Sequence, residues 1–238
     1  MRFFLIILLM LPSVLSNASS KCQPLRIAIL DTGLNLKDSR FKHLCPTGHK
    51  NFVKGETLDD VNNHGTFVAG LIEQYAKKSN YCMLIYKYYQ ESAPGEVNQE
   101  REVEAIREAI DNHADIINLS GGGPTFDEDE ALLIKYHPEI TFVVAAGNDG
   151  LDLDVPGNYY YPASLFYGNI EVVGNIDSFG IRDPDSNYGK RVENKEVGVM
   201  VHGRFIKGNG YMSGTSMSAA IFSGKLVDKL SKSCKYSR

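Results

Sequence analysis

A series of short apolar runs, each ending in small or polar residues, constrains the fold of this chain more than any other feature. The first, at residues 25–30, is almost continuously apolar, which is typical of a strand buried on both faces of a parallel sheet. Similar runs recur at residues 82–87, 115–120, 140–146 and 170–174. Helical patterns separate several of these runs. The sequence therefore predicts an α/β domain with three layers, α/β/α, around a mostly parallel central sheet.

Charged residues accompany the predicted helices. Residues 99–114 have the spacing of an amphipathic helix, with four apolar residues on one face: Val103, Ile106, Ala109 and Ile110. We expect the Glu and Arg residues of this helix to form a solvated face. The acidic run at residues 127–130 is expected to be the solvated start of the next helix, where negative charge matches the helix dipole.

Asp31-Thr32-Gly33 follows the first predicted strand, so the Asp31 carboxylate lies at a carboxyl end, where sites form in open α/β sheets. A carboxylate there is often only a turn or helix cap. The tripeptide also resembles the catalytic motif of aspartic proteases, which need two carboxylates that share a proton. The chain has no second Asp-Thr-Gly or Asp-Ser-Gly, so a homodimer would have to supply the partner.

His64 follows a polar stretch and opens a predicted helix of small residues, which Asn62 or Asn63 can cap. A helix N-terminus lowers the pKa of an imidazole, so we expect a pKa near the usual value of about 6.5 or below it. Such a group suits general base catalysis near neutral pH. The other histidines are interpreted as ordinary surface or core residues: His43, His49, His113, His137 and His202.

Ser216 lies in a run of small residues that leads into helical spacing as far as Leu230. The first N–H groups of a helix have no helical partner, so an oxyanion forming beside Ser216 would be stabilised there. Asn148 follows another apolar run, and its side-chain amide could donate to the same oxyanion. The plain alternatives are a Gly/Ser turn capping a core helix and an Asn-containing turn.

Glycines follow the run at residues 115–120 and leave an exposed backbone edge, to which an extended peptide could add as another strand. The alternative is a flexible turn.

The N-terminus has the pattern of a secretory signal, with Arg2, an apolar run at residues 3–11 and small residues around Ala18. We therefore expect a signal peptide at residues 1–18 and one domain at residues 19–238, secreted or periplasmic. The net charge of −4 and the lack of basic stretches argue against a nucleic-acid partner, and we expect no membrane association after signal removal. The four cysteines have no zinc or redox spacing. In an exported chain they indicate two disulfides, with three pairings open.

Taken together, five blocks of sequence resemble the subtilisin family of serine peptidases, in the family's order and over nearly the whole mature chain. The blocks are Ile29-Leu30-Asp31-Thr32-Gly33, His64-Gly65-Thr66-Phe67-Val68-Ala69-Gly70, Asn118-Leu119-Ser120-Gly121-Gly122, Ala145-Ala146-Gly147-Asn148 and Ser213-Gly214-Thr215-Ser216-Met217-Ser218. The resemblance implies that Asp31 orients the base, His64 is the base, Ser216 is the nucleophile and Asn148 donates to the oxyanion together with the Ser216 N–H. It also implies that residues 119–122 pair with the substrate backbone.

The chain departs from the family pattern in several places. Most subtilases have His where Phe67 stands and Pro near Ala219-Ala220, and we expect altered packing with intact catalysis. The spacing leaves no room for the usual propeptide, so this is expected to be a short exported member that lacks one. The insertion that builds a common calcium site is also missing, so we expect no metal and no cofactor. A separate inhibitor or chaperone could replace the propeptide.

The fold that the resemblance implies also favours one disulfide pairing. In that fold Cys22 and the end of the last helix, with Cys234, lie at the sheet edge opposite the catalytic groups. Cys82 opens a strand at that edge, next to the segment that follows Cys45. We therefore expect Cys22 to pair with Cys234, and Cys45 with Cys82.

These observations predict a secreted serine endopeptidase that acts on polypeptides through Asp31, His64 and Ser216. Three alternatives stay open: a catalytically silent binding protein with the same fold, the dimeric aspartic protease that uses Asp31, and an esterase with the same triad.

Overall fold

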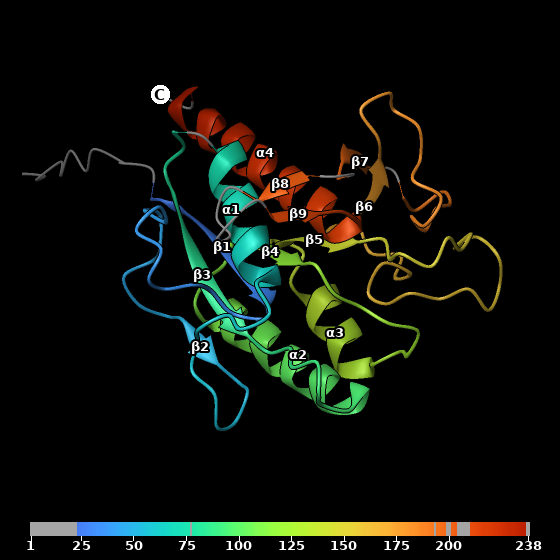
Figure 1. The fold of residues 1–238 in the computed structure, drawn as a ribbon, viewed down its shortest axis with the longest axis horizontal. Helices are drawn as coiled ribbons and strands as arrows, with labels where there is room; N and C mark the ends of the chain where they lie inside the picture. Colours follow the sequence, from blue (N-terminus) through green and yellow to red (C-terminus); the bar gives the residue numbers. More distant parts are fainter. Residues whose placement is uncertain (1–22, 77, 193, 199–200, 204–209, 237–238) are drawn as a thin grey trace, which may run out of the picture.

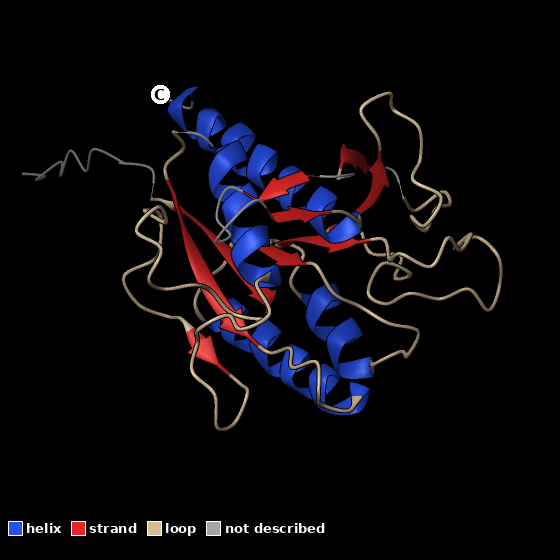
Figure 2. Ribbon diagram, in the orientation of Figure 1, coloured by secondary structure: helices blue, strands red, loops and turns tan. Residues whose placement is uncertain are grey.

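A parallel sheet between two layers of helices forms the body of the molecule (Figure 1, Figure 2). The structure, a computed structural model, describes residues 23–76, 78–192, 194–198, 201–203 and 210–236. The main sheet contains β1 (Leu25–Asp31), β2 (Lys50–Asn51), β3 (Tyr81–Lys87), β4 (Ile116–Leu119), β5 (Thr141–Ala145), β6 (Ile170–Ile176) and β7 (Asn194–Val197). The helices are α1 (His64–Ala76), α2 (Gly95–Asp111), α3 (Glu128–Tyr136) and α4 (Thr215–Tyr236), and β8 (Val201–Gly203) pairs with β9 (Gly210–Met212) in a small antiparallel sheet. The predicted fold class is confirmed.

The order of the strands creates the crevice in which a site can form. The main sheet runs β2-β3-β1-β4-β5-β6-β7, and all neighbouring strands are parallel. The chain therefore builds one half of the sheet beside β1, and then returns to the other side of β1 to build the second half. At such a reversal the loops leave the carboxyl ends in opposite directions and open a crevice between them. Asp31, the last residue of β1, lies at this point.

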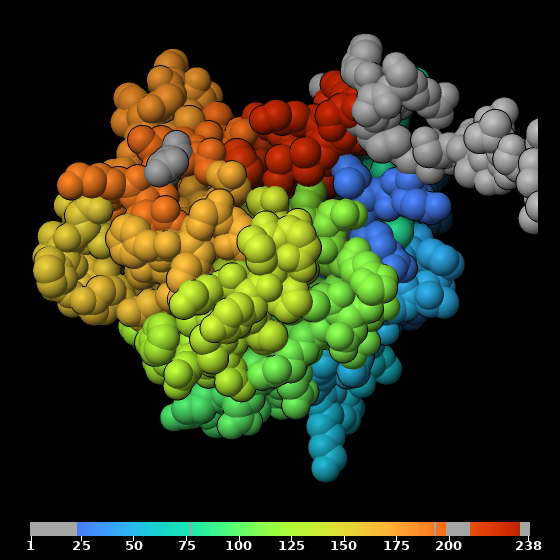
Figure 3. Space-filling view, turned by 180° about the vertical axis from the view of Figure 1, so that it is seen from behind, coloured from blue at the N-terminus to red at the C-terminus, as the bar shows by residue number. Residues whose placement is uncertain are grey.

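The central strands β1, β3, β4, β5 and β6 contribute alternate residues to two separate cores, because successive side chains of a strand point to opposite faces. Ile27 and Ile29 of β1 pack in the core beneath α1 and α4. Ala28 and Leu30 of the same strand pack in the core beneath α2 and α3. This explains why the strands read as continuous apolar runs. Seen from behind, the green residues of α2 lie at the bottom of the molecule and the red residues of α4 at the top (Figure 3).

Helix α4 packs directly against α1, and a glycine makes the close contact possible. A Cβ atom added at Gly224 would lie 2.7 Å from Cβ of Tyr75 and 2.9 Å from the carbonyl oxygen of Ile72. A larger residue at this position would push the helices apart. Because α4 begins at Thr215, directly before Ser216, the contact also fixes where Ser216 lies relative to His64, the first residue of α1.

Two acidic side chains on α2 and α3 differ from the prediction. Glu102 of α2 was expected on a solvated face, but it is only 8% exposed. Glu130 of α3 was expected in a solvated helix start, but it is only 2% exposed. Asp127 does act as expected, and its side chain accepts a hydrogen bond from the Glu130 N–H. The prediction fails for the two glutamates because periodicity does not reveal that α2 and α3 face each other across a cavity.

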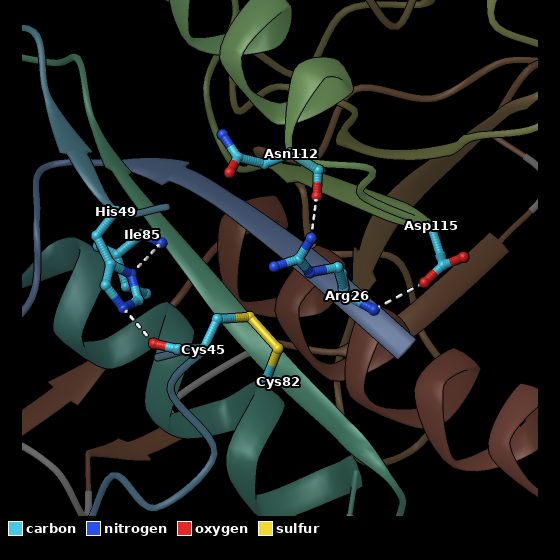
Figure 4. Close-up of a disulfide and its surroundings, with 7 residues drawn as sticks. All are labelled: Arg26, Cys45, His49, Cys82, Ile85, Asn112 and Asp115. Atoms are coloured by element: carbon cyan, nitrogen blue, oxygen red, sulfur yellow. Dashed lines mark hydrogen bonds between the residues drawn. A yellow bond between two sulfur atoms is a disulfide. The ribbon is translucent and has the colours of Figure 1, made fainter. Parts of the chain in front are cut away.

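The disulfide between Cys45 and Cys82 ties the segment before β2 to the start of β3 (Figure 4). The prediction of this pair is confirmed. The same segment is held a second time by His49, whose Nε2 donates to the Cys45 carbonyl oxygen at 2.8 Å, while its Nδ1 accepts from the Ile85 N–H at 3.1 Å. His49 is therefore a structural residue, as expected.

On the neighbouring strand, β1, the Arg26 N–H donates to Asp115 Oδ2 at 2.7 Å and thereby aligns β1 with the start of β4 (Figure 4).

Some predictions concern parts of the chain outside the described residues. The signal peptide at residues 1–18 lies there, as does Cys22, and the side chain of Cys234 is not described either, so the second disulfide stays a prediction. No helix within the described ranges is both long and apolar enough to span a membrane. In the same ranges no three His, Cys, Asp or Glu side chains gather closely enough to hold a metal ion. The expectation that no cofactor is used stays a prediction.

Replacing both Cys45 and Cys82 by Ala should lower the free energy of unfolding by about 2–4 kcal/mol, because the bridge closes a loop across a sequence separation of 37 residues. Urea unfolding followed by circular dichroism measures the change. The single Cys45→Ala variant, kept reduced, serves as a control for the lost side chain. Equal stability of wild type and double variant, or a Cys22–Cys45 linked peptide in non-reducing maps, would contradict the prediction.

Candidate active site

A hydrogen-bonded acid and imidazole lie at the carboxyl end of β1. Asp31 ends this strand and is 4% exposed, and its Oδ1 accepts a hydrogen bond from His64 Nδ1 at 2.8 Å. The Thr32 N–H donates to the same oxygen at 2.7 Å. Because Nδ1 carries the proton in this arrangement, His64 Nε2 is left as an acceptor. The pair can therefore take a proton from a third group.

Glycines allow the start of α1 to approach the turn after β1 this closely. A Cβ atom added at Gly65 would lie 2.4 Å from the carbonyl oxygen of Gly33 and 3.1 Å from Asp31 Oδ1. Gly33 itself has φ +113°, where L side chains are strained, and a Cβ there would lie 2.5 Å from the Leu58 carbonyl oxygen. Both contacts require the glycines, and the close approach sets His64 against Asp31.

The N-terminus of α1 is capped differently from the prediction. The Gly65 N–H donates to Thr32 Oγ1 at 2.9 Å, and the Thr66 N–H donates to Asp60 Oδ2 at 2.8 Å. Asp60 also accepts hydrogen bonds from Thr32 Oγ1 and from the Asn62 and Asn63 N–H groups. The side chains of Asn62 and Asn63 were the expected caps, but the cap is Asp60 with Thr32. The position of Asp60, a few residues before the helix, is a signal that sequence reasoning missed.

Two opposing effects act on the pKa of His64. Burial lowers the pKa, but the Asp31 carboxylate, through its charge and its hydrogen bond, and the Asp60 carboxylate raise it, so that the net pKa lies above the usual value. The expectation of an ordinary or lowered pKa is therefore wrong. That expectation considered only the helix N-terminus, which lowers the pKa, whereas the nearby carboxylates raise the pKa by more. The neutral imidazole that can act as a base prevails only at a pH above this raised pKa.

Ser216 lies in the first turn of α4 and is 9% exposed. Its Oγ donates a hydrogen bond to the Ser120 carbonyl oxygen at 2.9 Å. No hydrogen bond joins Ser216 to the His64 ring in the described part of the chain, although both residues line the same cavity. The Ser216 N–H has no acceptor one turn earlier in the helix, because α4 begins at Thr215. This leaves a backbone donor beside the hydroxyl.

A buried polar network joins β4 to α4 behind Ser216. Ser223 Oγ donates to Asn118 Oδ1 at 2.9 Å, and Asn118 Nδ2 donates to Ser120 Oγ at 3.0 Å. Ser120 Oγ in turn donates to the Ser216 carbonyl oxygen at 3.2 Å. Asn118, Ser120 and Ser223 are all buried, so each hydrogen bond compensates the loss of hydration. The network fixes the position of the Ser216 backbone relative to the sheet.

Asn148, which follows β5, is held by hydrogen bonds to the oxygen of its side-chain amide. Its Oδ1 accepts from the Thr215 N–H at 2.9 Å and from Thr215 Oγ1 at 3.1 Å, which leaves Nδ2 as a donor. The loop is held by buried Asn187, which donates to the Ala146 carbonyl oxygen at 2.9 Å and accepts from the N–H groups of Asp149 and Leu151. Sequence reasoning missed Asn187, because it lies far from Asn148 in the chain.

Two tyrosines lie behind the glycine-rich edge that follows β4. A Cβ atom added at Gly121 would lie 2.3 Å from the Tyr88 hydroxyl oxygen, and one at Gly122 would lie 2.6 Å from the Tyr160 ring. The Tyr160 ring also lies against Gly147, at 2.9 Å from a Cβ added there. The glycines therefore make room for aromatic side chains that wall the crevice. Neither tyrosine was singled out from the sequence.

One cavity of about 810 Å³ joins these groups. The predicted residues that line it are Asp31, His64, Ser120, Gly121, Gly122, Asn148 and Ser216. Leu119 does not line it, because its side chain is fully buried in the core beneath α2 and α3. The cavity also extends along α2 and α3, which sequence reasoning did not anticipate.

Comparison with known proteins gives consistent similarities. The sequence model of the subtilase family matches residues 24–236. Subtilisin DY of Bacillus licheniformis is 31% identical over 219 residues, which cover 87% of this chain and 77% of that protein. The major intracellular serine protease of Bacillus subtilis (strain 168) is 31% identical over 229 residues, covering 87% and 68%. Among solved structures, a cold adapted subtilisin-like serine proteinase superposes with a TM-score of 0.73 at 24% identity, covering 88% of this chain and 76% of the other.

NMR titration of the His64 ring should give a midpoint above about 6.5, the ordinary value for His. Asp31→Asn should lower this midpoint, because it removes the negative charge that favours the protonated ring and leaves the burial that disfavours it. The ring signals of the other histidines provide an internal reference. A wild-type midpoint below the ordinary value, or a midpoint that rises in Asp31→Asn, would refute this account.

Proposed function

Because this chain belongs to the subtilase family of serine peptidases, we propose that it is an endopeptidase in which Asp31, His64 and Ser216 form the catalytic triad. The observation that carries the proposal is the 2.8 Å hydrogen bond between His64 Nδ1 and Asp31 Oδ1, in the cavity that Ser216 also lines. That bond orients the ring and stabilises the charge that the ring acquires on taking a proton.

Catalysis begins with a change in the hydrogen bond of Ser216. Its hydroxyl leaves the Ser120 carbonyl oxygen and turns towards His64 Nε2, which accepts the proton as Oγ attacks the carbonyl carbon of the substrate. The protonated ring then gives this proton to the leaving amine, and the acyl group stays on Ser216. Water, activated by His64 in the same way, hydrolyses the acyl-enzyme and restores the hydroxyl.

The oxyanion of each tetrahedral intermediate accepts hydrogen bonds from Asn148 Nδ2 and from the Ser216 N–H. Asn148 suits this role because its Oδ1 is already held by Thr215, so the free amide hydrogens have a defined direction. The start of α4 adds the favourable end of a helix dipole. Preorganised donors of this kind need no rearrangement as charge develops.

Polypeptides are the substrates, and their backbone is proposed to pair with the edge at residues 119–122. The contribution of Leu119 is through its backbone alone, since its side chain is in the core. Gly123 is already paired with Tyr161, through hydrogen bonds of 3.0 and 2.7 Å, so the edge available to a substrate ends at Gly122.

The alternative mechanisms differ in what they require of Asp31. An aspartic mechanism needs a carboxylate facing Asp31, but its Oδ1 is occupied by the His64 ring and the Thr32 N–H. An esterase would use the same triad on a different leaving group. A silent binding protein would have no need of a reactive serine, and the labelling experiment below separates it from an enzyme.

The protein is proposed to act outside the cytoplasm, after removal of a signal peptide at residues 1–18 from a domain at residues 19–238. The N-terminal pattern of charge, apolar run and small residues supports this, as does the Cys45–Cys82 disulfide, since such bridges persist in oxidising compartments. The proposed chemistry needs no cofactor. A separate inhibitor or folding chaperone is proposed as a partner.

Ser216→Ala should abolish peptidase activity and reaction with a fluorophosphonate, because only the activated hydroxyl of Ser216 forms the acyl and phosphonyl adducts. Wild-type protein should label at a single site, identified as Ser216 by mass spectrometry. Thermal unfolding should be similar in both proteins. Activity retained in Ser216→Ala but lost in Asp31→Asn would favour the aspartic mechanism, and a wild type that does not label would favour the binding protein.

Asn148→Leu should reduce kcat by a factor of about 10²–10³ with little change in KM, because it removes a donor that acts on the transition state, a loss of about 2.7–4 kcal/mol as measured in a subtilisin. Thr215→Val is the matched control. It removes the hydroxyl bond to Asn148 Oδ1 and the acceptor of the Gly147 N–H, but it keeps the Asn148 amide and the Thr215 N–H bond to it, so a smaller loss is expected. Equal losses in the two variants would mean that Asn148 acts by holding α4 and does not contact the oxyanion.

A further inference from the structure

The catalytic cavity has an acidic extension that the proposed mechanism does not use. Beyond Gly121 and Gly122 it reaches α2 and α3, where Glu102 and Glu130 line its wall. Other carboxylates, Glu91 and Glu96, line the same side. The residues that line the cavity include no lysine and no arginine. Among the described residues that line the cavity, His64 is therefore the only one with a basic side chain.

Glu102 and Glu130 are buried without the partners that buried carboxylates usually have. They are 8% and 2% exposed, and neither forms an ion pair with a basic residue in the described part of the chain. The Tyr88 hydroxyl bonds to Glu102, and Glu102 bonds to Glu130. Glu130 Oε1 has no hydrogen-bond partner. Buried polar atoms are nearly always satisfied, so an unpartnered oxygen beside a cavity points to a group that arrives from outside.

Burial also disfavours a negative charge on both carboxyl groups. Burial raises the pKa of both Glu102 and Glu130, and the charge of Asp127 raises both further. The charge of Glu102 also raises the pKa of Glu130. The groups that face the pair are Tyr88 and Asp127, and neither supplies a positive charge. Both carboxyl groups are therefore more easily protonated than an exposed glutamate. A cation that entered the cavity would provide the missing positive partner.

We propose that the cavity beyond Gly121 and Gly122 binds a lysine or arginine side chain of the polypeptide substrate, with its cation against Glu102 and Glu130. The proposal rests on the proposed peptidase function and adds a determinant of specificity to it. A substrate strand paired with residues 120–122 projects alternate side chains to either side, so one side chain at a defined distance from the scissile bond would reach α2. The long apolar stem of Lys or Arg can pass Tyr88 and bring only its charged end to the carboxylates.

The simpler explanation is that the carboxyl pair only ties α2 to α3. In that case neutral amides would serve as well, and the charge of the substrate would not matter. The two explanations differ in one measurable quantity, the preference of the enzyme for a basic over a neutral isostere at one substrate position.

The test uses full-length mature protein and quenched peptides in which a single Arg is moved, position by position, through a neutral sequence, each paired with a Gln peptide. At one position wild type should cleave the Arg peptide with a kcat/KM at least about tenfold higher, mainly through a lower KM, as expected for a partly desolvated charge pair. Glu102→Gln and Glu130→Gln should each reduce the ratio to below about threefold. Glu104→Gln is the matched control, because Glu104 is exposed on the same helix and outside the cavity.

Two further measurements separate misfolding and inactivity from a failed proposal. Each variant is checked by its melting temperature and by its rate of fluorophosphonate labelling. Binding of the Arg and Gln peptides to Ser216→Ala protein, measured by calorimetry, should show the same preference without turnover. A wild type that labels at Ser216 but shows no preference at any position, or a preference that both Gln variants retain, overturns the inference alone. A wild type that neither labels nor cleaves overturns the proposed function.

Discussion

The close approach of α1 to the turn after β1 is the contact on which the rest of the site depends. It exists because Gly65 and Gly33 carry no side chains where a Cβ atom would collide with backbone oxygen. The approach sets the His64 ring against Asp31. It also fixes the axis of α1, and through the glycine contact at Gly224 it fixes α4. The three proposed catalytic side chains, which come from β1, α1 and α4, are therefore positioned by backbone packing.

Buried side-chain amides provide the second level of organisation. Asn118 connects β4 to α4, and Asn187 holds the loop that carries Asn148. Each amide both donates and accepts within the interior, so the loops at the carboxyl ends of the strands are held without a regular backbone partner. Interior hydrogen bonds of this kind are strongly directional, and an unsatisfied group would be costly. A crevice lined by loops can thus be as well defined as the sheet beneath it.

Charge is distributed unevenly around this crevice. His64 experiences burial and two carboxylates with opposite effects on its pKa, and the carboxylates prevail. On the wall formed by α2 and α3, burial acts without a compensating cation and raises the pKa of both carboxyl groups. On one side of the cavity, carboxylates thus stabilise the positive charge of the protonated His64 ring. On the other side, the carboxyl groups of Glu102 and Glu130 have no positive charge beside them. The first arrangement suits proton transfer, and the second suits recognition of a basic side chain.

The sequence by itself determined the layers of the fold, the type of most elements and the order of the blocks around Asp31, His64, Asn148 and Ser216. These follow from local information, because a strand buried on both faces must be apolar throughout and a turn at its end must contain small residues. Strand bounds agree closely with the predicted runs. Helix α2, predicted at residues 99–114, instead spans Gly95–Asp111, since apolar periodicity does not mark where a helix starts.

Only the tertiary structure decided which polar residues support the site and which are buried. The cap of α1 comes from Asp60 and Thr32, the hydroxyl of Ser216 donates to Ser120, and the pKa of His64 lies above its usual value. Glu102 and Glu130 look like solvated residues in the chain, yet they are buried. Apart from the cap by Asp60, which lies only a few residues before α1, each of these depends on groups far apart in sequence that the sheet topology brings together. Burial and electrostatic interaction are properties of that arrangement, and no local pattern of residues contains them.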